Sequence, residues 1–170
     1  VIFRISNNDV AFKYKIYPQG ETLSCVVKQE VTGFAFPDGT TTFLCPQSKP
    51  MGGFARTSPS YETSYTADDV AGKNGWGEGY TFPCLFRNGD NGWVLVSETG
   101  VNGGYCASPL LGHKGGVYTI GFPQEGEANG NGTVSPGIAL PGETPWRTIT
   151  VGKTLAPIVE TTVPFDVVKP

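Results

Sequence analysis

Histidine is nearly absent from this 170-residue chain, which has only His113. A single histidine cannot build a histidine-based metal site or a catalytic triad, and we predict that His113 is a solvated residue of the turn at 112–116. Clusters of basic residues are also missing, because 12 Lys and Arg are scattered among 15 Asp and Glu, which gives a net charge of -3. Phosphate binding needs clustered cations, so a nucleic-acid partner is excluded.

Long apolar runs and paired cysteine motifs are missing as well. No run approaches the roughly 20 apolar residues of a membrane-spanning helix, so we expect no membrane partner. The cysteines form no Cys-x-x-Cys pair, which argues against a zinc knuckle or a thioredoxin-type centre; they are Cys25, Cys45, Cys84 and Cys106. We predict buried free thiols, and a Cys25–Cys45 disulfide is left open as an alternative.

Glycine, proline and aromatic residues are abundant. The 24 Gly and 14 Pro together make up more than a fifth of the chain, and aromatic residues make up 12%. This balance favours many short strands joined by tight turns, and no amphipathic helix of useful length is found. The length suits one domain, for which we predict an all-β antiparallel β-sandwich with little or no helix.

The predicted strands follow from apolar alternation between turn signals. They cover residues 1–5, 10–17, 23–27, 32–36, 41–44, 80–87, 93–98, 117–122, 146–151 and 158–163. The stretch 51–71 has no clear period, and 121–145 is rich in Gly and Pro and predicts a long surface loop. We place the sandwich domain at 1–163 and an exit linker at 164–170.

The candidate functional residue is Glu98, which ends an apolar strand. Alternation puts Val94, Val96 and Glu98 on one face of that strand, so the carboxylate continues an apolar row into the glycine-rich segment 100–104. A buried carboxylate is costly unless it is paired or bound to a metal, so Glu98 marks a candidate site. The alternative is that Glu98 lies just past the sheet edge in water.

Several motifs, in order, resemble the N-terminal β-sandwich domain of glycoside hydrolase family 97, a family of α-glucosidases and α-galactosidases known chiefly from gut Bacteroides. They read AFKY at 11–14, FPCLF at 82–86, WVLVSETG at 93–100 followed by Tyr105, TPWR at 144–147, and residues 155–162. The resemblance covers most of the chain. One departure is Lys13, where the family usually has Arg.

The resemblance implies part of a galactose-mutarotase-like super-sandwich that packs on a C-terminal (β/α)8 barrel. The catalytic carboxylates would lie in that barrel, outside this chain, so the domain alone would be inactive. Glu98 would be one ligand of a calcium ion shared with the barrel, and Asn102 and Tyr105 would form part of the sugar-pocket rim. The family also implies an α-linked oligosaccharide as substrate and a periplasmic or secreted location.

Two further expectations accompany this interpretation. The family's sandwich begins before the strand equivalent to 1–5, so the chain corresponds to the latter part of a larger sandwich. The alternative function is a stand-alone carbohydrate-binding or lectin-like module, which would expose aromatic residues on one surface; Tyr61, Tyr65 and Trp76 are the candidates, because they lie in polar, irregular segments.

Overall fold

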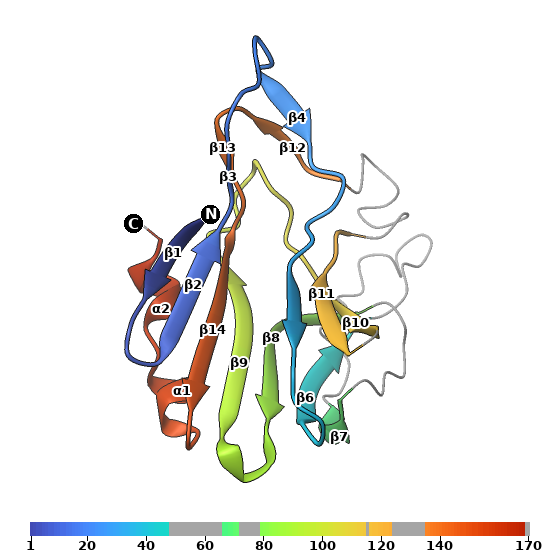
Figure 1. The fold of residues 1–170 in the computed structure, drawn as a ribbon, viewed down its shortest axis with the longest axis vertical. Helices are drawn as coiled ribbons and strands as arrows, with labels where there is room; N and C mark the ends of the chain where they lie inside the picture. The colour runs from blue at the N-terminus through green and yellow to red at the C-terminus, as the bar shows by residue number, and fades with distance from the viewer. Residues whose placement is uncertain (48–65, 72–78, 115, 124–134, 169–170) are drawn as a thin grey trace, which may run out of the picture.

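The fold is antiparallel β throughout, as a computed structural model shows for residues 1–47, 66–71, 79–114, 116–123 and 135–168 (Figure 1). These residues form one ten-stranded sheet, two separate two-stranded sheets and two short helices. The prediction of an all-β, sandwich-type domain is confirmed. No helix in these ranges is long and apolar enough to cross a membrane.

The large sheet curls around the core. Its main path runs β1-β2-β14-β9-β8-β10-β11-β5, and β6 pairs with both β8 and β7. The strands are β1 (Ile2–Ile5), β2 (Asp9–Lys13), β5 (Gly33–Ala35), β6 (Thr41–Pro46), β7 (Thr66–Val70), β8 (Tyr80–Arg87), β9 (Trp93–Thr99), β10 (Leu110–Lys114), β11 (Val117–Ile120) and β14 (Trp146–Gly152).

The two small sheets extend from one end of the large sheet, at the top of Figure 1. Strand β3 (Lys15–Ile16) pairs with β13 (Gly142–Glu143), and β4 (Ser24–Val26) pairs with β12 (Gly137–Ala139). The prediction of one continuous loop over 121–145 is therefore wrong for its last part. The local sequence does not predict β12 and β13, because their backbone groups form hydrogen bonds with segments more than 100 residues earlier in the chain.

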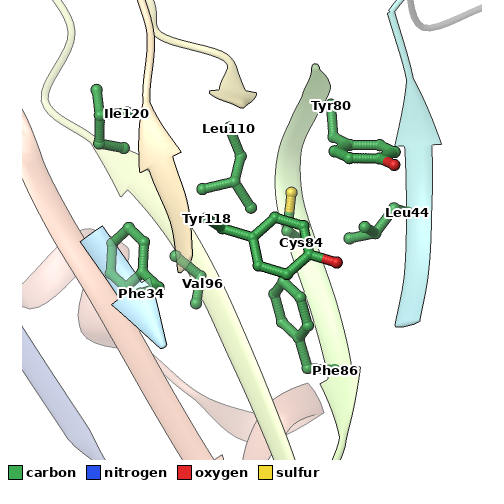
Figure 2. Close-up of a cluster of buried hydrophobic side chains, with 9 residues drawn as sticks. All are labelled: Phe34, Leu44, Tyr80, Cys84, Phe86, Val96, Leu110, Tyr118 and Ile120. Atoms are coloured by element: carbon green, nitrogen blue, oxygen red, sulfur yellow. The ribbon is translucent and has the colours of Figure 1, made fainter. Parts of the chain in front are cut away.

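The main core is aromatic and is built from residues of β5, β6, β8, β9, β10 and β11 (Figure 2). Phe86, Cys84 and Val96 have no exposed surface, and Tyr118 is 1% exposed at the centre of the cluster. The Phe36 and Phe86 rings stack with their centroids 4.0 Å apart. Cys84 fills the core as a small apolar group, as predicted, and none of the four cysteines forms a disulfide.

The C-terminal segment is helical where we expected a strand. Residues predicted as the strand 158–163 instead form helix α1 (Ala156–Glu160) and the start of α2 (Val163–Asp166). Each helix has a proline in its first turn, where the fixed φ of proline suits a helix and its missing N–H costs nothing. Val163, Val167 and Val168 pack against Ala11 and Trp146, so the chain stays attached to the sheet beyond residue 163. The linker role of 164–170 stays a prediction.

Three smaller predictions also need correction. His113 lies in strand β10 and not in a turn, because β10 extends to Lys114 and pairs with β11. The predicted strand 10–17 is divided at Tyr14 between β2 in the large sheet and β3 in a small one. The irregular stretch 51–71 ends in strand β7, whereas its first part, with Tyr61 and Tyr65, lies outside the described residues, as does Trp76.

Candidate functional site

Glu98 lies on the core face of β9, as its alternation with Val94 and Val96 predicts. Strand β9 pairs with β14 in a register that places Glu98 directly opposite Arg147. The Glu98 side chain is 9% exposed, so the alternative of a carboxylate in open water is wrong. A half-buried strand therefore ends in a carboxylate that has a cation as its cross-strand neighbour.

Arg147 is the centre of the site, and its side chain has no exposed surface. Its guanidinium binds Glu30 through two parallel hydrogen bonds, from Nε to Oε1 at 2.9 Å and from Nη2 to Oε2 at 2.6 Å. Its Nη1 donates to Oε2 of Glu98. Nη2 also donates to Oγ of Ser108 at 3.1 Å, and the Ser108 N–H donates to Oε1 of Glu98 at 2.8 Å. A planar fork of donors thus fixes two carboxylates at once.

A second layer of hydroxyl groups surrounds Glu30, whose side chain is 4% exposed. The Thr32 hydroxyl donates to Oε1 of Glu30 at 2.8 Å and lies 3.0 Å from the Tyr14 hydroxyl. The Tyr105 hydroxyl donates to Oε2 of Glu30 at a long 3.5 Å. The network connects the segment before β5, strands β9 and β14, and the segment before β10, so its geometry depends on the whole sheet.

The charges in this site do not cancel. Two carboxylates face one guanidinium, which leaves one surplus negative charge in a region with little water. Burial raises the pKa of Glu98 above its ordinary value of 4.5, against the opposing effects of the Ser108 N–H and Arg147. Burial alone would lower the pKa of Arg147, but its bonds to Glu30 and Glu98 raise it, so Arg147 stays charged. The site therefore favours either a proton or an added cation near Glu98.

The donors partly fit the calcium ion that the family resemblance implies. Carboxylate oxygens are what calcium prefers, and the two Glu98 oxygens accept hydrogen bonds from the Ser108 N–H and from Arg147. Calcium takes six to eight oxygen ligands, however, and the described part of the chain has no group of three or more candidate ligand side chains. Glu98 can thus supply one ligand, and the others would have to come from elsewhere.

The two residues predicted for a sugar-pocket rim lie in one tight turn beside this site. Asn102 and Tyr105 form an isolated β-bridge, and Oδ1 of Asn102 accepts the N–H of Gly104 at 2.8 Å. Asn102 is exposed, whereas Tyr105 is only 5% exposed and its ring packs edge-on against Phe122. Their roles toward a sugar stay predictions, and only Asn102 has the exposure that such a contact needs.

Sequence reasoning did not assign Glu30, Ser108 or Arg147 to the site. Nothing near Glu30 in the sequence distinguishes it from a surface glutamate, because its burial results from long-range packing. Arg147 did carry a signal, since it interrupts the apolar alternation of Trp146 to Val151 and belongs to the TPWR motif. An arginine on the core face of a strand predicts a buried carboxylate partner.

Comparisons with known proteins identify the family of this chain. The family model described as Glycosyl-hydrolase 97 N-terminal matches residues 1–170. The chain belongs to this family. A solved β-arabinopyranosidase is 61% identical, with a TM-score of 0.94 over 99% of this chain. A glycoside hydrolase family 97 enzyme from Pseudoalteromonas sp. strain K8, in complex with acarbose, is 21% identical, with a TM-score of 0.73 over 99% of this chain.

The Pseudoalteromonas enzyme was also solved as a variant in complex with panose, at 21% identity and a TM-score of 0.72. At this identity, both Pseudoalteromonas structures show the fold alone. The chain spans 27% of the length of the β-arabinopyranosidase and 23% of the Pseudoalteromonas enzyme. No curated protein matches the chain.

Proposed function

We propose that this chain is the N-terminal accessory domain of a glycosidase, and that it packs on a C-terminal catalytic (β/α)8 barrel of the same enzyme. The observation that carries this proposal is the 61% identity to a β-arabinopyranosidase over 99% of the chain. The described carboxylates support an accessory role, because Glu30 and Glu98 are bridged by Arg147. Glycoside hydrolysis needs two carboxyl groups that flank a sugar, one on each side of the scissile bond.

The proposed substrate class is supported by the relatives and by sugar stereochemistry. A β-L-arabinopyranoside has the ring configuration of an α-D-galactopyranoside and lacks only the exocyclic hydroxymethyl group. The β-arabinopyranosidase relative is therefore compatible with the α-galactosidase type that the motifs resemble. We propose that the enzyme acts on arabinopyranosides in preference to α-galactosides and α-glucosides.

Glu98 is the residue through which the domain would assist the barrel. In this proposal Glu98 is one ligand of a calcium ion whose other ligands are barrel carboxylates. Arg147 and Ser108 orient the Glu98 carboxylate, and the surplus negative charge of the site attracts the cation. When bound, calcium would connect the two domains and add positive charge near the sugar. A periplasmic or secreted location is proposed from the family alone.

Three substrates with the same leaving group test the activity. The full-length protein is assayed with p-nitrophenyl β-L-arabinopyranoside, α-D-galactopyranoside and α-D-glucopyranoside, beside the 170-residue chain alone. We expect kcat/KM to be highest for the arabinopyranoside and no turnover by the chain alone. Turnover by the isolated chain would contradict the accessory role, and a preference for the glucoside would contradict the proposed substrate.

A further inference from the structure

A polar groove lies at the opposite end of β9 from Glu98. Glu98 lies five positions after Trp93 along this strand, which corresponds to about 17 Å. The groove has a volume of about 360 Å³ and is formed by the β1–β2 turn, the β8–β9 connection and the end of β14, at the lower end of the sheet in Figure 1. The groove is thus separate from the Arg147 site, although the same sheet supports both.

Polar side chains gather in this groove, and the Trp93 ring among them also contacts Phe43 and lies beneath the Arg87 guanidinium. Asn88, Asn91 and Trp93 line it, and no side-chain hydrogen bond of these three residues occurs within the described part of the chain. The indole N–H and the two amides offer donors and acceptors to a ligand. Asn8, a third asparagine of the groove, already has a protein partner. Its Nδ2 donates a hydrogen bond to the Val151 carbonyl at 3.0 Å.

The groove is preorganised by main-chain contacts. The Asn88 N–H donates to the Gly92 carbonyl at 2.9 Å, and the Asn91 N–H donates to the Asn88 carbonyl at 2.8 Å, so the amide side chains are not needed to hold the connection. A Cβ at Gly92 would lie 2.5 Å from the Gly152 carbonyl oxygen. A side chain at residue 92 would therefore push the two strands apart, and glycine keeps the floor of the groove closed.

The amides of the groove suit a hydroxyl-rich ligand. No carboxylate side chain lines the groove, and the amine of Lys153 already donates to the Asp90 carbonyl at 2.5 Å. Amides pair with sugar hydroxyls both as donors and as acceptors, and the volume lies within the range of small-molecule sites. We propose that this groove is a sugar-binding site that binds without cleaving, because it lacks the two carboxyl groups that hydrolysis requires.

Hydrogen exchange of the backbone measures occupancy of the groove directly. The full-length protein is incubated with maltose, melibiose or L-arabinose, and amide exchange of a peptide covering residues 88–93 is followed by mass spectrometry. We expect at least one sugar to slow this exchange, because a ligand on the two amides opposes opening of the connection. In the N88A/N91A variant, the sugar concentration that gives half-maximal protection should rise about tenfold or more, because two hydrogen bonds are lost.

Two matched variants sharpen this test. N7A removes a neighbouring exposed asparagine outside the groove and should leave the protection unchanged, whereas W93F keeps an aromatic ring and should weaken it through loss of the indole N–H. Sugar protection that persists in N88A/N91A would overturn the proposal, as would protection by inorganic phosphate but by none of the sugars. Protection confined to peptides outside residues 88–93 would overturn it as well.

Discussion

Arg147 and Glu98 face each other across the β14–β9 pair, and the same guanidinium binds Glu30 through two hydrogen bonds. All three side chains are at least nine-tenths buried. Charge pairs at this depth add less stability than their number implies, because desolvation offsets much of the attraction. The ion pairs instead fix the position of the Glu98 carboxylate at the end of β9.

Removal of the shared cation should destabilise the domain strongly. Arg147→Met leaves Glu30 and Glu98 buried without their counter-charge, which we expect to cost about 3–5 kcal/mol in the free energy of unfolding. Urea unfolding of the chain measures this cost. The control Arg87→Met removes a half-buried arginine that makes a long 3.4 Å bond to the Gly89 carbonyl and a cation–π contact with Trp93, and it should cost less than about 1 kcal/mol.

A triple variant separates charge from packing. If the loss in Arg147→Met comes from uncompensated charge, then adding Glu30→Gln and Glu98→Gln should recover part of the stability, because no ion then remains buried in the site. A triple variant less stable than Arg147→Met would show instead that the shape of the arginine side chain dominates.

Glu98→Gln should raise the calcium requirement of the full-length enzyme. Glutamine keeps one oxygen but loses the charge that attracts a divalent cation, so the calcium concentration for half-maximal thermal stabilisation should rise about tenfold or more. Glu160→Gln, on an exposed part of α1, is the control. Identical calcium curves for Glu98→Gln and the wild type would contradict the metal-ligand role and leave Glu98 only its pairing with Arg147.

The pH dependence of stability should reveal a different ion pair on the surface. Lys13 donates to Glu143 at 2.5 Å, and this hydrogen bond lowers the pKa of Glu143 below its ordinary value of 4.5. A carboxylate with a lowered folded-state pKa stabilises the fold above its unfolded pKa, and this contribution is lost as the pH falls through the folded pKa. The stability difference between wild type and Glu143→Gln should therefore be full at neutral pH and shrink below about pH 4.5. A difference independent of pH would exclude an ionic origin.

The strands that carry the site are predictable, whereas its partners are not. Residues 93–98 predict β9, and the alternation of side-chain directions along a strand, whose period is two, places Glu98 on the same face as Val94 and Val96. The same alternation in 158–163 is misleading, since short apolar runs also suit a helix and the prolines at 157 and 164 decide the outcome. Sequence cannot predict that Arg147 lies opposite Glu98, because the register between β14 and β9 is set by packing over the whole sheet.

The aromatic core should be sensitive at Phe86. This ring has no exposed surface and stacks on Phe36 at 4.0 Å, so Phe86→Ala removes a large apolar group and leaves a cavity. We expect a loss of about 3–5 kcal/mol in the free energy of unfolding, measured with urea. Phe165→Ala is the matched control, because Phe165 is 80% exposed, and it should change stability by less than about 0.5 kcal/mol. Equal losses for the two variants would show that the cluster in Figure 2 does not dominate stability.

The four thiols should react in two groups. Cys45 and Cys84 are 2% and 0% exposed, so a reagent has little access to either thiol. Burial also raises the pKa of Cys84, which suppresses formation of its thiolate. Cys25 and Cys106 are half-buried, although burial also raises the pKa of Cys106. With a thiol reagent such as Ellman's reagent, we expect Cys25 to react first, Cys106 next, and Cys45 and Cys84 only as the chain unfolds.

Single Cys→Ser variants assign each phase of the reaction, and urea should accelerate only the slow phase. Rapid reaction of Cys84 in the folded protein would show that β8 opens without global unfolding.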